Sequence, residues 1–176
     1  QTLRAELSGW GSWTDRAIVL SYAMPAGLFV VGFTIAADWA FAQFESLYHH
    51  TPWAVLIWTP ALTALIAWIT TRWFPGAAGS GIPQIKAALH PALPPERRGM
   101  FVSLRLTVAK IVLGVGGFAA GLSVGREGPS VQVAAGVMQH ARRWLAPGSS
   151  IDTRALLTAG GAAGIAAAFH APPGGG

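Results

Sequence analysis

Two short motifs, each with glycines followed by proline, hold the residues of this chain best suited to chemistry. They read GSGIP at residues 79–83 and GREGP at residues 125–129. Glycine permits backbone dihedrals that other residues avoid, and proline fits the first turn of a helix. Each motif therefore predicts a helix start, where free N–H groups and the positive end of the helix dipole attract an anion.

The two motifs differ in charge. The first has no acidic residue and offers a hydroxyl donor, Ser80, so it predicts an anion site; the alternative is a plain loop that the serine caps. The second places a carboxylate, Glu127, in the attracting position. This side chain can act as a tethered anion, which occupies the site when ionised and leaves when protonated. The alternative is a helix-capping glutamate paired with Arg126.

The composition is that of a membrane protein rather than a soluble one. Of the 176 residues, 52% are hydrophobic and 11% are charged, against about 25% charged in typical soluble domains. The Lys and Arg residues are scattered, which argues against nucleic acid as a partner and favours a lipid bilayer. The absence of Cys excludes thiolate ligands, and the five His residues lack ligand spacing, so we expect no metal and no cofactor.

Two long apolar segments predict membrane spans, at 17–42 and 53–71, after a mixed segment at 1–16 that we expect at the membrane interface. The link at 48–52 has no Lys or Arg, whereas basic residues flank the other ends of both spans. The positive-inside rule then puts this link outside and the 90–103 loop inside. We therefore expect a multi-pass integral membrane protein of the plasma or inner membrane.

Shorter helices are predicted at 82–89, 129–145 and 153–169, the last with Asp152 as N-cap. A third long helix is predicted at 102–124. Short, Gly/Pro-interrupted helices are costly in lipid unless they line a polar cavity. The alternation of long and broken helices therefore indicates a binding site near the middle of the membrane.

Glycines four residues apart predict close helix packing in two places. Gly117, Gly121 and Gly125 stand at the end of the third long helix, and Gly160 and Gly164 stand in the last helix. Such spacing lets the backbones of neighbouring helices approach closely in a membrane.

Together these features resemble the ClC family of chloride channels and chloride/proton antiporters. Both motifs, at 79–83 and 125–129, match the family's pattern in order and separation. Lys110 stands where the family has a buried lysine. The stretch at 166–172 is similar to the family's Ala-Ala-Phe-Asn-Ala-Pro, with His170 in place of Asn. The resemblance covers nearly the whole chain.

The resemblance implies an all-α integral membrane protein that moves chloride, as a channel or as a chloride/proton antiporter, and is not an enzyme. Ser80 would donate its hydroxyl to a central chloride. The backbone around Gly81, Ile82 and Pro83 would form the inner part of the pathway. The transported ion would be the ligand.

The second motif would form the outer part of the same pathway. By the resemblance, Glu127 would be the gate that blocks the outer anion site and exchanges protons. The backbone amides of Arg126, Glu127 and Gly128 would line that site. Family subunits also pair as homodimers, so a second copy and protons join chloride and lipid as expected partners.

The resemblance also marks a difference in length. A ClC subunit contains two inverted halves, and residues 1–176 correspond to the N-terminal part of one transmembrane domain, with the second half absent. The alternative to chloride transport is therefore a truncated, transport-inactive membrane fragment.

A third interpretation is an intramembrane serine hydrolase that uses Ser123. Residues 121–125 match the nucleophile elbow G-x-S-x-G, and Asp152 and His170 follow in the order of that enzyme class. That elbow needs a preceding strand, whereas here it follows an apolar, glycine-rich helix. We therefore prefer the anion-transport interpretation.

Overall fold

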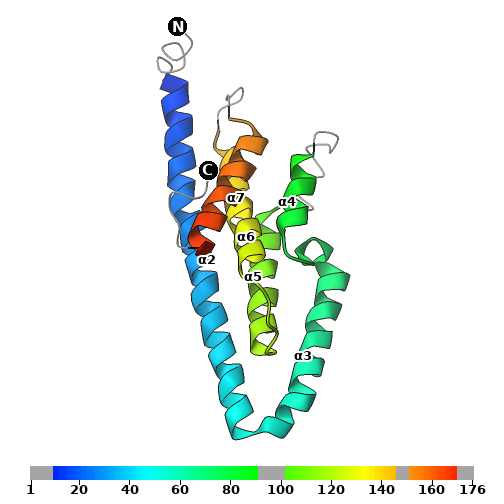
Figure 1. Ribbon diagram of the computed structural model, residues 1–176. Helices are drawn as coiled ribbons and strands as arrows, with labels where there is room; N and C mark the ends of the chain where they lie inside the picture. The colour runs from blue at the N-terminus through cyan, green and yellow to red at the C-terminus, as the bar shows by residue number, and fades with distance from the viewer. Residues whose placement is uncertain (1–9, 91–101, 146–150, 170–176) are drawn as a thin grey trace.

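The computed structural model describes residues 10–90, 102–145 and 151–169, and the ordered elements in these ranges are helices (Figure 1). They are α2 (Trp10–His50), α3 (Pro52–Trp73), α4 (Ile82–Leu89), α5 (Leu104–Ala119), α6 (Glu127–His140) and α7 (Thr153–Phe169), with single 3₁₀ turns η1 (Pro75–Ala77) and η3 (Ala141–Arg143). No strand occurs in the described ranges. The predicted all-α membrane fold is therefore confirmed.

Helices α2 and α3 are the two arms of a V that meet at Thr51 (Figure 1). Both are long and apolar enough to cross a membrane, with mean hydropathies of 2.0 and 1.7 in their most apolar windows. No residue of α3 is buried, so this helix presents apolar side chains on all sides. Its bounds extend the predicted span of 53–71 by only one residue at the start and two at the end.

Helix α2 is longer than the span predicted from the sequence. It has 41 residues, which at about 1.5 Å per residue is about 60 Å, roughly twice the hydrocarbon thickness of a bilayer. The predicted span of 17–42 is therefore the middle of this helix. The helix also includes residues 10–16 of the segment expected at the interface, and residues 48–50 of the link. Residues 1–9 lie outside the described part of the chain.

Helix α5 is shorter than predicted. The sequence favoured a helix to residue 124, but α5 ends at Ala119 because Gly121 adopts φ of +80°. The ring of Phe44 lies against this glycine, and a Cβ there would be 2.2 Å from the ring. Gly121 and Gly125 consequently lie beyond the helix. The prediction that they continue a helix-packing stripe from Gly117 is wrong.

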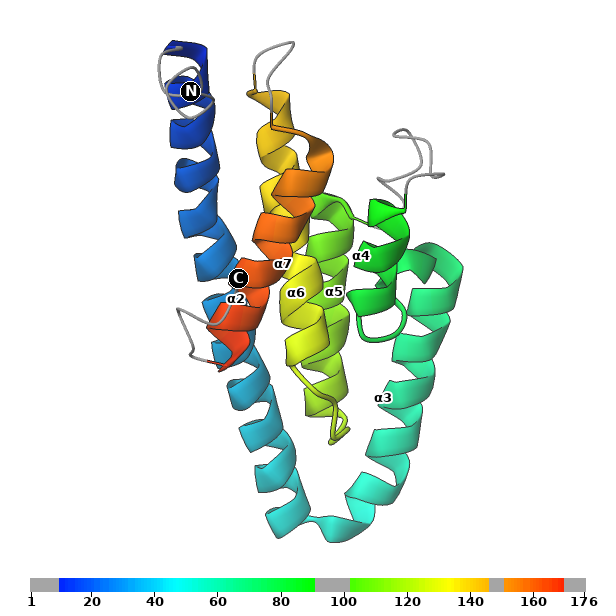
Figure 2. The same ribbon diagram turned by 45° about the horizontal axis from the view of Figure 1, so that its top comes forward.

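Helix α6 is the buried centre of the bundle, because every residue from Gly128 to Met138 is buried. It lies between α2, α5, α4 and α7 (Figure 2). The sequence predicted a helix over 129–145. The α-helix begins two residues earlier, at Glu127, because Pro129 lies in the first turn, where its missing N–H has no helical partner. It ends at His140, and η3 continues the chain.

Helix α7 packs on α6 through two glycines, as the sequence predicted. A Cβ on Gly160 would lie 2.6 Å from the Cα of Ala135, and a Cβ on Gly164 would lie 2.7 Å from the Cα of Val131. Only glycine allows the two backbones to come this close. The predicted bounds of 153–169 match α7.

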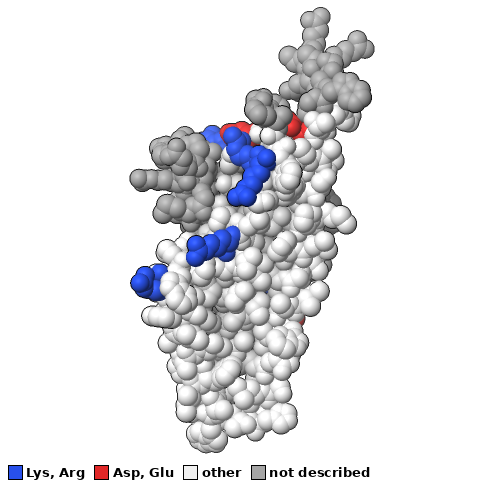
Figure 3. All heavy atoms as spheres, turned by 180° about the vertical axis from the view of Figure 1, so that it is seen from behind, with Lys and Arg blue, Asp and Glu red and all other residues white. Residues whose placement is uncertain are grey.

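Basic side chains gather at the end of the molecule opposite the α2–α3 link. On the face that Figure 3 shows, Lys and Arg lie in the upper part, with some Asp or Glu atoms beside them, and the lower part shows only one small acidic spot. The described residues at the basic end include Arg16, Lys86, Arg105, Arg143 and Arg154. A broad uncharged surface with a basic rim at one end is the charge pattern of a protein that crosses a membrane.

Candidate functional site

The first motif forms a tight turn into α4. Gly79 and Gly81 have φ of +72° and +96°, in the left-handed region that only glycine enters at low cost. Gly81 is the N-cap of α4, and Pro83 stands in its first turn. The predicted helix of 82–89 is confirmed in both bounds.

Buried side chains hold the carbonyl groups of the loop before α4. Gln132 Nε2 donates to the carbonyl oxygen of Gly76 at 3.0 Å. Lys110 Nζ donates to the carbonyl oxygen of Ala77 at 2.8 Å and also to that of Gly79. Gln84 Nε2 donates to the carbonyl oxygen of Ala78. Four consecutive acceptors are thereby satisfied by side-chain donors, and Lys110 and Gln132 are themselves buried.

The N–H groups that follow these carbonyls are left without acceptors. Within the described part of the chain, the backbone N–H groups from Gly79 to Ile82 donate to no protein atom. The first bond in this region is that of the Ile85 N–H to the Gly81 carbonyl, at 3.2 Å. A row of free donors at a helix start is what an anion requires.

The second motif forms the corresponding start of α6. Arg126 is the N-cap, and its carbonyl accepts the Ser130 N–H at 3.0 Å. The N–H groups from Gly125 to Gly128 donate to no acceptor among the described residues. Glu127, the acidic residue of the first turn, is exposed. Its carboxylate turns back over Gly125, where a Cβ would lie 2.7 Å from Oε2.

The structure brings the two motifs into direct contact. A Cβ on Gly128 would lie 2.1 Å from the Ser80 carbonyl oxygen and 2.9 Å from the Ser80 Cβ. A Cβ on Gly81 would lie 2.8 Å from the Gly128 carbonyl oxygen and 2.8 Å from the Gln132 Cβ. The two buried glycines therefore let both helix starts meet, although 44 residues separate Gly81 from Gly125 in the sequence.

The other predicted residues lie around this contact. Ser80, Ile82 and Pro83 are exposed on the first motif, as Glu127 is on the second. A cavity of about 350 Å³ lies beside both motifs, lined by Gly79 and by residues of α3 and α5 among others. None of the predicted anion-binding residues lines this cavity.

Arg126 pairs with a residue other than Glu127. Its Nη2 contacts Asp38 Oδ1 of α2 at 2.5 Å, and its guanidinium lies over the ring of Phe118, 5.2 Å from the centroid. The alternative interpretation of Glu127 as a cap paired with Arg126 therefore has no support from this geometry. Asp38 lies within the predicted span of 17–42.

Gln132 and Asp38 are the residues of this site that sequence reasoning missed. The sequence contained a signal for Gln132. A polar side chain among the apolar residues of α6 needs a hydrogen-bond partner when it is buried. The partner of Asp38 had no signal, since Arg126 is 88 residues away.

The residues of the serine-hydrolase interpretation do not come together. Ser123 precedes α6 and Asp152 follows it, so the helix separates them. Asp152 Oδ1 instead accepts the N–H of Thr153 at 2.6 Å, next to the start of α7. The described residues contain no strand before Ser123, and His170 lies outside them. In the same ranges no group of His, Asp and Glu could hold a metal ion.

Comparison with known proteins identifies a family to which this chain is similar. Residues 62–176 match the family model described as voltage gated chloride channel. The chain is 35% identical over 169 residues to the H(+)/Cl(−) exchange transporter ClcA of Citrobacter koseri, covering 90% of the chain and 34% of that relative. It is 36% identical over 154 residues to ClcA of Cronobacter sakazakii, covering 84% of the chain and 32% of that relative.

ClcA of Yersinia pestis gives a similar result, with 33% identity over 153 residues, 83% of the chain and 31% of the relative. The chain thus spans about a third of the length of these transporters. With helix starts of the matching sequence in mutual contact, and a family model that covers well over half of the residues, the chain belongs to the voltage-gated chloride channel, or ClC, family.

Proposed function

We propose that this chain transports chloride across a membrane, with an anion site at the two helix starts and a glutamate as its gate. The observation that carries the proposal is the contact between residues 79–83 and 125–129, whose first N–H groups donate to no acceptor among the described residues. The similarity to H(+)/Cl(−) exchange transporters supports chloride as the anion and protons as its partner.

In this proposal the first motif binds chloride. The Ser80 hydroxyl and the N–H groups of Gly81 and Ile82 replace part of the ion's hydration shell, and Pro83 fixes the turn that presents them. No acidic side chain belongs to this motif, so its positive end stays open to an anion. Lys110 and Gln132 keep the loop carbonyls turned toward themselves and away from the ion.

The second motif supplies the gate. The ionised carboxylate of Glu127 competes with chloride for the donors of Arg126, Glu127 and Gly128, whereas the protonated carboxyl does not. Proton uptake and anion binding at this site are therefore linked. Binding must stay weak enough for chloride to leave, as conduction requires.

The proposed location of the chain is a cell membrane, the plasma or inner membrane. Residues 1–176 form the N-terminal part of a ClC-type transmembrane domain, with the α2–α3 link outside and the basic end inside. The proposed partners of the chain are a second copy of the parent subunit, lipid and protons. Nucleic acid is not a proposed partner. The alternative is that the chain inserts and packs without transporting.

Chloride flux in proteoliposomes separates the proposal from this alternative. We expect chloride efflux above that of empty liposomes, and we expect Glu127→Gln to abolish the pH dependence of the efflux. Glu45→Gln, a matched loss of an exposed carboxylate on α2, is the control and leaves the pH dependence unchanged. Efflux equal to that of empty liposomes would establish the transport-inactive fragment.

A further inference from the structure

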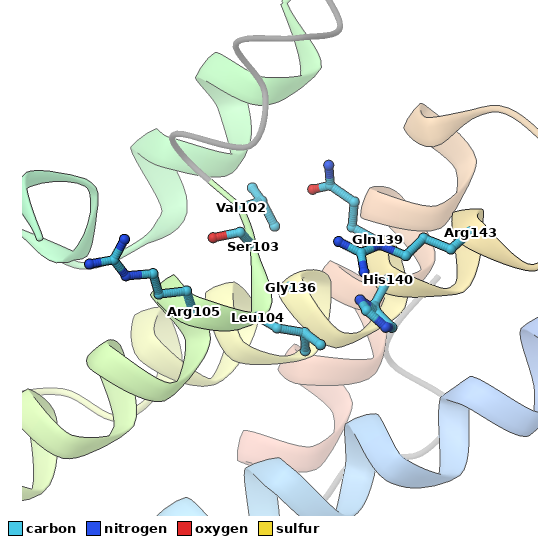
Figure 4. A pocket seen from close by; sticks show the side chains of 8 residues that line it. All are labelled: Val102, Ser103, Leu104, Arg105, Gly136, Gln139, His140 and Arg143. Carbon is cyan, nitrogen blue, oxygen red and sulfur yellow. The ribbon is translucent and has the colours of Figure 1, made fainter.

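A second cavity lies at the basic end of the bundle, away from the two motifs. It has a volume of about 440 Å³ and lies between the start of α5 and the end of α6. In Figure 4 the Arg143 side chain extends back over His140 toward the space in front of Gly136, with Ser103 on the opposite side of that space. The residues that line it include no Asp or Glu.

Hydrogen-bond donors converge on this cavity from both helices. Arg143 supplies a guanidinium. The Ser103 oxygen accepts the Leu106 N–H at 3.3 Å, which leaves the hydroxyl hydrogen free to donate. The N–H groups of Leu104 and Arg105 have no acceptor among the described residues. Guanidinium, hydroxyl and helix-start N–H groups together are the donor set that binds a phosphate group.

One acceptor in the cavity also lacks a partner. The side-chain oxygen of Gln139 is buried and accepts no hydrogen bond within the described part of the chain. A buried polar atom of this kind normally has a partner in the native state. A hydroxyl group on a bound molecule would supply the missing donor.

Two apolar grooves lie along α5, and one of them shares a lining residue with this cavity. One, of about 470 Å³, lies on the α3 side and includes Arg105, which also lines the cavity. The other, of about 380 Å³, lies on the α2 side. Val108 and Val112 line both grooves and are 53% and 62% exposed, so they form a ridge between them. Among the described residues, Arg105 is the one charged residue that lines either groove.

We propose that this surface binds an anionic phospholipid whose headgroup carries hydroxyls, with the phosphate in the cavity and one acyl chain in each groove. Arg143, the Ser103 hydroxyl and the first N–H groups of α5 bind the phosphate, and a headgroup hydroxyl donates to Gln139. The cavity lies at the level where headgroups are found, because it opens at the basic end beyond the uncharged surface (Figure 3). The lipid site does not depend on chloride transport.

Native mass spectrometry of the chain from mixed micelles tests the proposal. The probes are dioleoyl phosphatidylglycerol and dioleoyl phosphatidylcholine, which share acyl chains and differ in headgroup charge. We expect one retained phosphatidylglycerol per chain and at least tenfold weaker retention of phosphatidylcholine. Arg143→Gln weakens phosphatidylglycerol retention about tenfold, which corresponds to about 1.4 kcal/mol. Equal retention of the two lipids would overturn the proposal.

Arg142→Gln is the matched control, because Arg142 is the exposed neighbour with the same charge and does not line the cavity. We expect its retention of phosphatidylglycerol to equal that of the unmodified chain. Equal losses in the two variants would show general charge attraction and refute a defined site. Inorganic phosphate at millimolar concentration should leave the lipid bound, and displacement by phosphate would refute the role of the grooves.

Discussion

The starts of α4 and α6 resemble each other in backbone features and differ in charge. Both follow glycines, both have proline in the first turn, and both have N–H groups that donate to no acceptor in the part of the chain that the structure describes. The α4 start has no acidic residue, and buried side chains bind the carbonyls before it. The α6 start has its own carboxylate, Glu127, and its cap residue pairs with α2. The first turn of α4 thus has no acidic side chain, and the first turn of α6 has one.

In the proposed function this difference couples two ions at one site. There the donor row of α4 binds chloride, whereas the donor row of α6 responds to protonation of its carboxylate. Ser80 and Gly128 are in contact, so the proposed coupling needs no long pathway between the two starts.

The contact itself is the feature whose loss should have the largest effect. Gly128→Ala places a Cβ 2.1 Å from the Ser80 carbonyl oxygen, so the two helix starts must separate. We expect the free energy of unfolding in detergent micelles to fall by about 1–3 kcal/mol, as for other overpacked cores, and chloride flux to be lost. SDS titration followed by circular dichroism measures the first effect.

Gly32→Ala is the control for this variant, since a Cβ on Gly32 meets no atom within 4 Å. We expect it to stabilise α2 slightly, because alanine is favoured over glycine inside a helix by about 1 kcal/mol. If both variants behave alike, the two helix starts are not in contact.

Lys110→Met should have the next largest effect, and at the α4 start only. It removes the donor to two backbone carbonyls in a buried place. Hydrogen bonds from charged groups contribute about 1.5–3 kcal/mol, so we expect a loss of about 2 kcal/mol in unfolding free energy and weaker chloride binding. Lys86→Met, at an exposed lysine of α4, is the matched control and should change neither quantity.

Asp38→Asn should have the smallest effect on stability, and this effect should be confined to the α6 start. The Asp38–Arg126 pair is partly exposed, with side-chain exposures of 60% and 34%, and such pairs contribute about 0–1 kcal/mol. We expect a small loss in stability that disappears in high salt, and a changed pH dependence of chloride flux because Arg126 becomes free beside Glu127. An effect on chloride affinity as large as that of Lys110→Met would contradict the division between the two helix starts.

The positions of glycine and proline explain how much of the fold the sequence predicted. Gly81 and Pro83 mark the start of α4, and Gly160 and Gly164 mark the face of α7, so both helices were predicted with correct bounds. The end of α5 was not, because the residues after Ala119 are apolar and small like those before it. The helix ends there because Gly121 adopts φ of +80° and the Leu122 N–H turns back to the Gly117 carbonyl oxygen at 3.0 Å, with the distant Phe44 ring packed on the glycine.

In the candidate site, too, the local features were predicted and the tertiary contacts were not. The motifs themselves were predicted, since glycine and proline act on their own backbone. The contact of Ser80 with Gly128, the pairing of Asp38 with Arg126 and the carbonyl contacts of Gln132 are tertiary. They join residues far apart in the sequence, so no local pattern specifies them.

Chloride binding as a function of pH tests the tethered carboxylate most directly. Isothermal titration of the chain in detergent micelles compares its chloride affinity at pH 4.5 and pH 7.5. We predict that chloride binds more weakly at the higher pH, because the ionised carboxylate competes for the same N–H donors, and that Glu127→Gln binds chloride equally well at both. A pH dependence that persists unchanged in Glu127→Gln would contradict the proposed gate.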